Sequence, residues 1–305
     1  ETSREIETLA AHIDLVPSLI DLLKLEDVKR PAELAIEGRS LRRALDGADE
    51  DLRGRIVVID NQRRDHLQKY KQAAVMRDEF DAEGRIHRKW RLVSADEAGR
   101  WELYDVLGDP RQKRDLAAVA EHRDVVKELA AAYEDWWSRA SRRADDYARI
   151  VLGSVAEPAT CLYAHDWHTE GAVPWDQVMV AEGQPGNGFH AVSFARDGVY
   201  LFDLRRWPRE IASETNLDTA LSTPIIGRGG RTTGKALPIR SACLKIWRDD
   251  QVIFNGTLDA EPDADGVQFR VPVEVGPAMV QSWFYDEDGD EIAGAYYIYV
   301  ERVER

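Results

Sequence analysis

The chain has 305 residues, of which 44% are hydrophobic and 32% charged, with a formal net charge of −15. This composition is typical of a soluble protein with hydrophobic cores, and no apolar run approaches the roughly 18 residues that a membrane span needs. The acidic balance repels phosphate backbones, so neither a membrane nor a nucleic acid is an expected partner. Residues 151–305 hold 13 Lys/Arg against 24 Asp/Glu, so this half should also bind sulfated polyanions poorly.

The first predicted element is an amphipathic helix over residues 13–23, whose apolar residues recur at intervals of three and four. Asp14 is suited to the N-cap, and Pro17 to the first turn, where a missing N–H group does no harm. We expect this helix to be buried. A second short helix over residues 40–45 begins at a serine and ends before Gly47.

Four strand-like runs and one long helix come next. The runs are short and rich in β-branched or aromatic residues, whereas the helix carries its apolar residues on one face. The strands are expected at residues 55–60, 73–77, 87–93 and 100–105, and the helix at residues 124–139. We therefore predict a small antiparallel sheet packed with a long helix over residues 52–141.

The character of the sequence changes near residue 150, where short strands separated by turn signals replace the helical period. Asp197-Gly198 lies between two apolar runs, which is typical of a hairpin. Strands are expected at residues 191–195, 199–204, 242–247, 251–254, 268–273, 279–285 and 295–300. We predict an all-β sandwich here. The whole chain is then α+β, with domains at residues 1–149 and 150–305.

The sequence contains two cysteines, Cys161 and Cys243, each in an apolar, strand-like run. Two distant cysteines form neither a disulfide framework nor a zinc site. We expect both side chains to be small buried hydrophobic groups. A single bridge between them is the alternative.

Several ordered segments in the first half resemble the C-terminal part of bacterial arylsulfatases, in the sulfatase branch of the alkaline phosphatase superfamily. The segments are HIDLVPSL at 12–19, DNQR at 60–63, AVMR at 74–77, KWRLV at 89–93, ELYDV at 102–106 with Asp109-Pro110, and YEDWW at 133–137. The resemblance implies that residues 1–149 comprise the end of a sulfatase catalytic domain and its C-terminal subdomain. Residues 150–305 look like the extra C-terminal region of some environmental bacterial sulfatases.

The family's reaction uses a formylglycine made from the Cys or Ser of C/S-x-P-S-R, beside a divalent metal that is usually calcium. Neither can be assigned here, because Cys161 is followed by Leu-Tyr-Ala and Ser222-Thr223-Pro224 by Ile-Ile. We therefore expect no catalytic and no metal-binding residue in this chain, which would be catalytically incomplete alone.

The same resemblance says where the missing parts would lie. Calcium and formylglycine are expected in a missing N-terminal sulfatase domain, which would be this chain's partner. The parent protein's substrate would be a sulfated small molecule or glycan, with a phosphonate or phosphate monoester as an alternative. A periplasmic or secreted location is a family expectation.

A polar, mostly basic loop follows the first predicted strand. In the family, the corresponding subdomain borders the active-site cleft, and basic side chains there could attract a sulfated anion; arginine offers the forked geometry that sulfate prefers. The candidate substrate contacts are Gln62, Arg64, His66 and Lys69. The alternative is a solvated loop whose basic groups pair with neighbouring acids.

The motif His165-Asp166-Trp167-His168 has the composition of a metal site. On a strand, however, His165 and His168 would face opposite sides, so a turn would have to bring them together. A structural turn is the simplest interpretation, and we keep His165 and His168 as candidate substrate contacts. The acidic run 286–291 does not fit the spacing of a calcium loop and is interpreted as a hairpin tip.

Aromatic residues are dense in the second half of the chain. They include Trp167, Trp175, Trp207, Trp247, Trp283, Tyr296, Tyr297 and Tyr299. Such residues usually fill a sandwich core, but rings in a row on an exposed face would suit sugar stacking. The alternative function is therefore a non-catalytic carbohydrate-binding or interaction module on a sulfatase-like platform.

Overall fold

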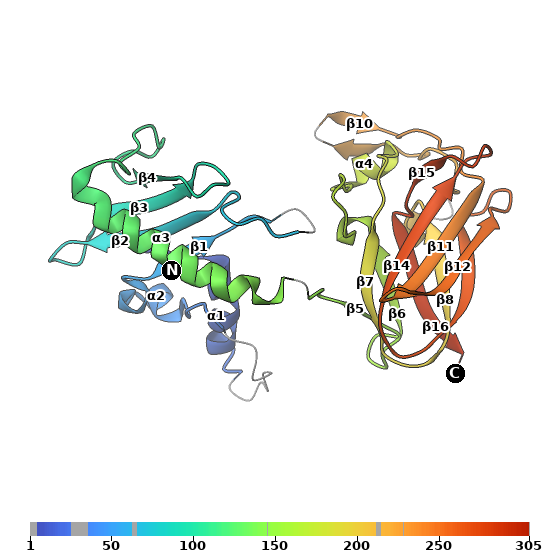
Figure 1. The fold of residues 1–305 in the computed structure, drawn as a ribbon, viewed down its shortest axis with the longest axis horizontal. Coiled ribbons are helices and arrows are strands. Elements are labelled where there is room, and N and C mark those ends of the chain that lie inside the picture. The colour runs from blue at the N-terminus through green and yellow to red at the C-terminus, as the bar shows by residue number, and fades with distance from the viewer. Residues whose placement is uncertain are drawn as a thin grey trace. The chain divides into compact units, whose positions relative to one another are not determined.

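The computed structural model describes residues 5–25, 36–62, 66–144, 146–211, 215–227 and 229–304. The chain is mixed, with mostly strands and few helices, and forms two compact units, Glu1–Ala144 and Asp145–Arg305 (Figure 1). The boundary predicted between residues 149 and 150 lies five residues further along. None of the helices in the described ranges is long and apolar enough to cross a membrane.

The first unit contains a four-stranded antiparallel sheet in the order β1-β2-β3-β4. Its strands are β1 (Ile56–Ile59), β2 (Ala74–Phe80), β3 (Ile86–Ser94) and β4 (Trp101–Asp105). Helix α3 (Arg123–Ala140), preceded by η3 (Ala120–His122) and followed by η4 (Ser141–Arg143), contacts all four strands (Figure 1). Alternating strand residues such as Val75, Leu92 and Leu103 are fully buried and pack with Leu129 and Tyr133 of the helix.

Short helical turns precede this sheet: η1 (His12–Asp14), α1 (Leu15–Leu22), α2 (Arg42–Asp46) and η2 (Glu50–Leu52). Two expectations for α1 are wrong. The helix is not buried, because its large apolar side chains are about half exposed. Asp14 does occupy the N-cap position, but its side chain makes no capping bond, because other groups engage it. Gly47 ends α2 with a φ of 108°, a left-handed conformation that suits glycine.

The second unit contains two larger sheets. One has the order β12-β11-β14-β7-β5, with β15 beside β14, and the other has the order β13-β8-β16-β6. The strands of the first are β5 (Ile150–Leu152), β7 (Phe189–Phe194), β11 (Ser241–Arg248), β12 (Gln251–Asp259), β14 (Gly276–Tyr285) and β15 (Glu291–Ala293). Those of the second are β6 (Ala159–Tyr163), β8 (Gly198–Arg205), β13 (Gly266–Val273) and β16 (Tyr297–Glu304). A two-stranded ribbon of β9 (Ile225–Gly227) and β10 (Gly230–Thr232) is separate from both.

One hydrophobic core joins the two sheets. Phe194 and Leu244 come from the larger sheet, Phe202 and Phe269 from the smaller one, and all four are buried in the same cluster. The rings of Phe194 and Phe202 meet edge to face, with centroids 6.4 Å apart. Burial alternates strictly along β13, as expected of a strand with one face on a core.

A second cluster of buried side chains lies around two short helical segments, η5 (Ala164–Asp166) and α4 (Gln177–Ala181). It includes Trp167, Trp207 and Tyr296, so these aromatics are core residues. The expectation of a region without helices is wrong here, because α4 forms; a further short helical turn is η6 (Arg209–Ile211). The cysteines are free thiols, Cys243 buried and Cys161 half-buried, so the alternative of a bridge is also wrong.

Candidate functional site

The carboxylate of Asp14 is completely buried and holds the first helix in place. Arg55 donates two hydrogen bonds to it, from Nη1 at 2.7 Å and Nη2 at 2.9 Å. The backbone N–H groups of Ala11 and Arg39 donate two more, at 2.8 and 2.9 Å. Burial alone would raise the pKa of Asp14, but these hydrogen bonds outweigh it and lower the pKa below its usual value. The acidic residue of the HIDL motif is therefore a structural anchor.

Although α1 is anchored, its apolar stripe is exposed. Its large side chains have exposed fractions between 46% and 63%: Leu15, Val16, Leu19, Leu22 and Leu23. They are spaced at three and four residues and so share one side of the helix. Isolated exposed leucines are normal on protein surfaces, whereas a contiguous apolar stripe of this kind is typical of interaction surfaces or of surfaces prone to aggregation.

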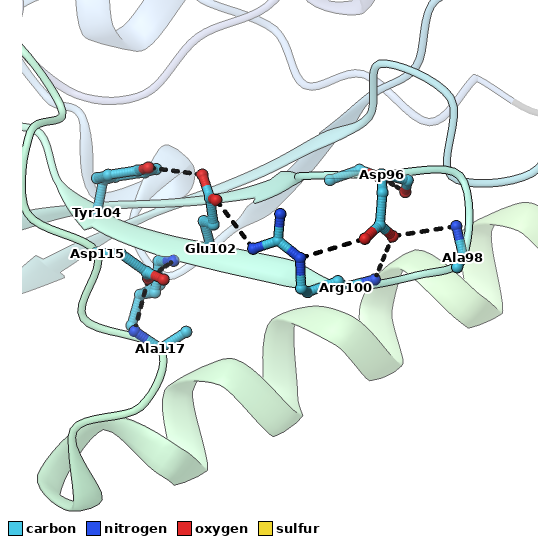
Figure 2. Close-up of polar contacts among 9 residues, drawn as sticks. Asp96, Ala98, Arg100, Glu102, Tyr104, Asp115 and Ala117 are labelled. Carbon is cyan, nitrogen blue, oxygen red and sulfur yellow. Dashed lines mark hydrogen bonds and ion pairs between the residues drawn. The ribbon is translucent and has the colours of Figure 1, made fainter.

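A network of polar groups follows the edge strand β4 (Figure 2). The guanidinium of Arg100 donates to Asp96 and to Glu102, at 3.2 and 3.1 Å, and the Tyr104 hydroxyl donates to Glu102 at 2.7 Å. The bond to Glu102, together with burial, raises the pKa of Tyr104 to about 12. Asp115 accepts from the backbone N–H of Leu103 at 3.0 Å and so covers part of the strand edge.

The remaining acidic residues of the ELYD and DP segments stabilise turns. Asp105 accepts from the backbone N–H groups of Lys89 and Leu107, each at 3.2 Å. Asp109 accepts from those of Lys113 and Arg114, at 2.7 and 2.9 Å. These carboxylates thus order the end of the sheet, and nothing in their geometry indicates catalysis.

The basic loop between β1 and β2 is tied to helix α3. Lys69 Nζ lies 2.5 Å from a carboxylate oxygen of Glu134, and the Tyr70 hydroxyl donates to the other oxygen at 2.5 Å. The hydrogen bond to Glu134 raises the pKa of Lys69. The Gln62 amide bonds the backbone of Gln68 in both directions, at 2.9 and 3.0 Å. The side chains of Gln62 and Lys69 therefore hold the loop in place.

His66 and Arg64 are the other two predicted substrate contacts of this loop. His66 is exposed and available to a ligand, whereas Arg64 lies outside the described residues.

The buried hydroxyl of Tyr133 links the two ends of the loop: it donates to Asp60 and accepts from the backbone N–H of Tyr70, each at 2.9 Å. Burial raises the pKa of Tyr133 well above its usual range. Sequence reasoning missed Tyr133 in this role, because its partners are more than 60 residues away.

The two candidate histidines of the second unit contact different aromatic rings. His165 is exposed in the turn η5 and meets Trp175 edge to face, with ring centroids 4.6 Å apart. His168 stacks on Phe189 at 5.1 Å and contacts Tyr147 at 4.6 Å. No group of three or more His, Cys, Asp or Glu suited to a metal occurs within the described ranges. The HDWH motif thus forms a turn with aromatic neighbours.

A small depression of about 100 Å³ lies beside this turn. Buried residues of the second core cluster, Val180, Tyr296 and Tyr297 among them, form part of its lining. Exposed side chains also line it: Tyr163, His165, Trp175, Asp176 and Gln177. The site therefore combines an apolar base with imidazole, carboxylate and amide groups at its rim. Sequence reasoning named His165 but gave Trp175 no individual role.

Comparisons with known proteins give a limited likeness to sulfatases. No family model and no curated protein matches this chain. Solved structures that match include a 2-O GAG sulfatase, a sulfatase candidate from Bacteroides thetaiotaomicron VPI-5482, and a protein in complex with its substrate D-glucosamine-2-N,6-O-disulfate. The identities are 25%, 26% and 20%, and the TM-scores 0.29, 0.28 and 0.28.

Each match covers 44% of this chain and only 25–26% of the solved structure. The chain thus spans about a quarter of the length of the structures it matches. TM-scores of this size do not establish a common overall fold, so the sulfatase assignment is a proposal that depends on this chain's own residues.

Proposed function

We propose that this chain is the C-terminal part of a sulfatase, a sulfuric ester hydrolase of the arylsulfatase type. Its first unit would complete the catalytic fold and wall the substrate cleft, and the chain alone would not turn over substrate. The order of the HIDL, KWRLV, ELYD and YEDWW segments supports this proposal. The hydrogen bonds of Asp14, Asp105 and Tyr133 give these segments a structural role, as expected of a subdomain that supports a cleft.

The observation that carries the proposal is the exposed apolar stripe of α1. The buried ion pair fixes the orientation of the helix. Leu15, Leu19 and Leu23 therefore stay in water unless another element covers them. Covering a leucine that is about half exposed contributes roughly 1 kcal/mol. Five such side chains together would contribute roughly 5 kcal/mol, and we propose a sulfatase catalytic domain as the element that covers them.

The catalytic groups would belong to that domain. The 305 residues contain no C/S-x-P-S-R segment, and the described part offers no cluster of acids for calcium. The described residues therefore do not fit the metal, and its chemistry would belong to the other domain. The parent's substrate would be a sulfated small molecule or glycan, and a periplasmic or secreted location would suit it.

The loop between β1 and β2 would form one side of the cleft. Lys69 is paired with Glu134 and Gln62 with the loop backbone, so we propose that both position the loop. His66 is exposed and would be the direct contact to the organic part of the substrate. Arg64 is proposed as a contact on its chemistry alone.

Sulfate release tests this proposal. The product of the complete reading frame and the 305-residue chain are compared on 4-nitrophenyl sulfate and on a panel of sulfated disaccharides, with calcium. We expect release by the complete product and none by the chain alone. Enzymatic turnover by the 305-residue chain, or release by neither protein on any substrate, would contradict the proposal.

A further inference from the structure

The exposed aromatic residues of this protein gather at one place. Among the residues that the structure describes, Tyr163 and Trp175 are the two Phe, Tyr or Trp side chains that are exposed, at 49% and 53%. They are 12 positions apart in sequence, and both line the depression beside η5. The other tryptophans of this unit are buried or half-buried, so their rings are used in packing.

Polar side chains that can bind hydroxyl groups surround these two rings. His165 meets the ring of Trp175, and Asp176 and Gln177 follow Trp175 directly. The Gln177 amide and the Tyr297 hydroxyl are hydrogen-bonded at 2.9 Å, which fixes the amide at the rim. The amide still has a second N–H, and Asp176 has a second carboxylate oxygen beside the one that caps α4. Donors and acceptors thus lie next to the aromatic faces.

The base of the depression is held rigidly. Tyr296 is 1% exposed, and its hydroxyl donates to the carbonyl of Gln184 at 2.8 Å. Arg206 is fully buried and donates to the carbonyls of Ala181 and Lys235, which ties α4 to a neighbouring segment. A site supported in this way loses little conformational entropy when a ligand binds.

We propose that this depression binds a neutral saccharide, with a sugar ring stacked on Trp175. The C–H face of a pyranose is apolar and matches an indole ring, whereas its equatorial hydroxyls need adjacent amide, imidazole and carboxylate partners. This combination of surfaces is present at Trp175, His165 and Gln177. A proline-rich peptide also stacks on tryptophan, but it presents few hydroxyls for the polar rim.

The charge of the site favours a neutral sugar over a sulfated one. None of the described residues that line the depression is a lysine or arginine, and Asp176 contributes a negative charge. Residues 151–305 as a whole are strongly acidic. A sulfated glycan would therefore be repelled, so the second unit would hold an unsulfated part of a polysaccharide. This inference does not depend on the proposed sulfatase relationship.

Affinity electrophoresis of the complete chain tests this inference. Gels contain a neutral polysaccharide (β-glucan, galactan, xylan or mannan) or chondroitin sulfate, and a polyproline peptide is added as a competitor. We expect retardation by at least one neutral polysaccharide. Trp175→Ala should weaken that binding by about tenfold or more, whereas Trp175→Phe should keep it within about threefold because a ring remains.

Val252→Ala is the matched control, because Val252 is 52% exposed and lies on β12 away from the depression. It should bind like the wild type, and unchanged unfolding midpoints would confirm that all variants are folded. The inference is overturned if no neutral polysaccharide retards the protein, if Trp175→Ala binds normally, if chondroitin sulfate alone is bound, or if binding at Trp175 is specific to polyproline.

Discussion

Asp14 and Arg55 form an ion pair from which water is almost excluded, with side-chain exposures of 0% and 5%. Two parallel hydrogen bonds and two backbone donors surround the carboxylate, so each charge depends on its partner. Removing one member of such a pair leaves the other charge buried and uncompensated. Asp14 is therefore more important for stability than the exposed ion pairs of the same unit.

We predict that Asp14→Ala lowers the free energy of unfolding of the first unit by about 3–5 kcal/mol. The measurement is urea unfolding followed by circular dichroism. Asp21→Ala serves as a control, because Asp21 pairs with Arg42 at the surface with both side chains about 40% exposed, and its loss should change stability by less than about 1 kcal/mol. Equal effects of the two substitutions would contradict the role assigned to Asp14.

His190 should make the second unit sensitive to mild acid. Burial lowers its pKa to about 4, although the ring contacts the carbonyl of Tyr163 at 3.0 Å. In the unfolded chain the imidazole takes up a proton near pH 6.5, whereas the folded state keeps it neutral down to about pH 4. The unfolded state therefore binds more protons in this window, and stability is lost as the pH falls below about 6.5.

When the pH falls from 7 to 5, protonation of His190 in the unfolded chain should reduce the free energy of unfolding by about 2 kcal/mol. Unfolding curves of wild type and His190→Gln at both pH values check this, since carboxylates contribute equally to both proteins. The pH dependence should be weaker in His190→Gln than in the wild type. Identical pH dependence of wild type and His190→Gln would refute the assignment.

At the level of elements, helix α1 shows what a periodic pattern can and cannot predict. The stripe of Leu15, Leu19 and Leu22 predicted a helix, and the helix forms. The prediction that it is buried was wrong, because an apolar stripe indicates a partner but not whether that partner lies within the same 305 residues. The carboxylate of Asp14 was similarly misassigned, because its partner Arg55 lies 41 residues away.

An uncovered stripe should make the 305-residue chain self-associate. We predict that light scattering after size-exclusion chromatography shows mass rising with concentration, and that Leu19→Asp weakens the association by about tenfold or more. Leu107→Asp, at a comparably exposed but isolated leucine, should have no such effect. A wild-type chain that remains monomeric at every concentration would count against a docking role for this stripe.

The strands were more predictable than the short helical elements. Strand β13 alternates buried and exposed residues, so its sequence pattern reports its position in the sheet directly. Helix α4 has five residues, too few for a helical period, and its N-cap Asp176 accepts one hydrogen bond, from Met179, that the sequence does not reveal. Its formation brings Trp175 to His165, and sequence reasoning could not foresee that contact.

At the level of the whole molecule, each of the two compact units carries one interaction feature. The first has an anchored helix with an uncovered apolar stripe, and the second has a rimmed depression that contains the exposed aromatic rings of the described chain. The proposed functions of the units are complementary, because one would complete a catalytic domain and the other would hold a neutral part of the same glycan. Neither role needs a catalytic group from this chain.

Peptide mass spectrometry of the protein purified from its native source tests the sulfatase assignment most directly. We predict a polypeptide that contains both the HIDLVPSL segment and a C/S-x-P-S-R segment, in which the Cys or Ser has been converted to formylglycine. A native polypeptide that contains the HIDLVPSL segment but, at full sequence coverage, neither the motif nor the aldehyde would contradict the account.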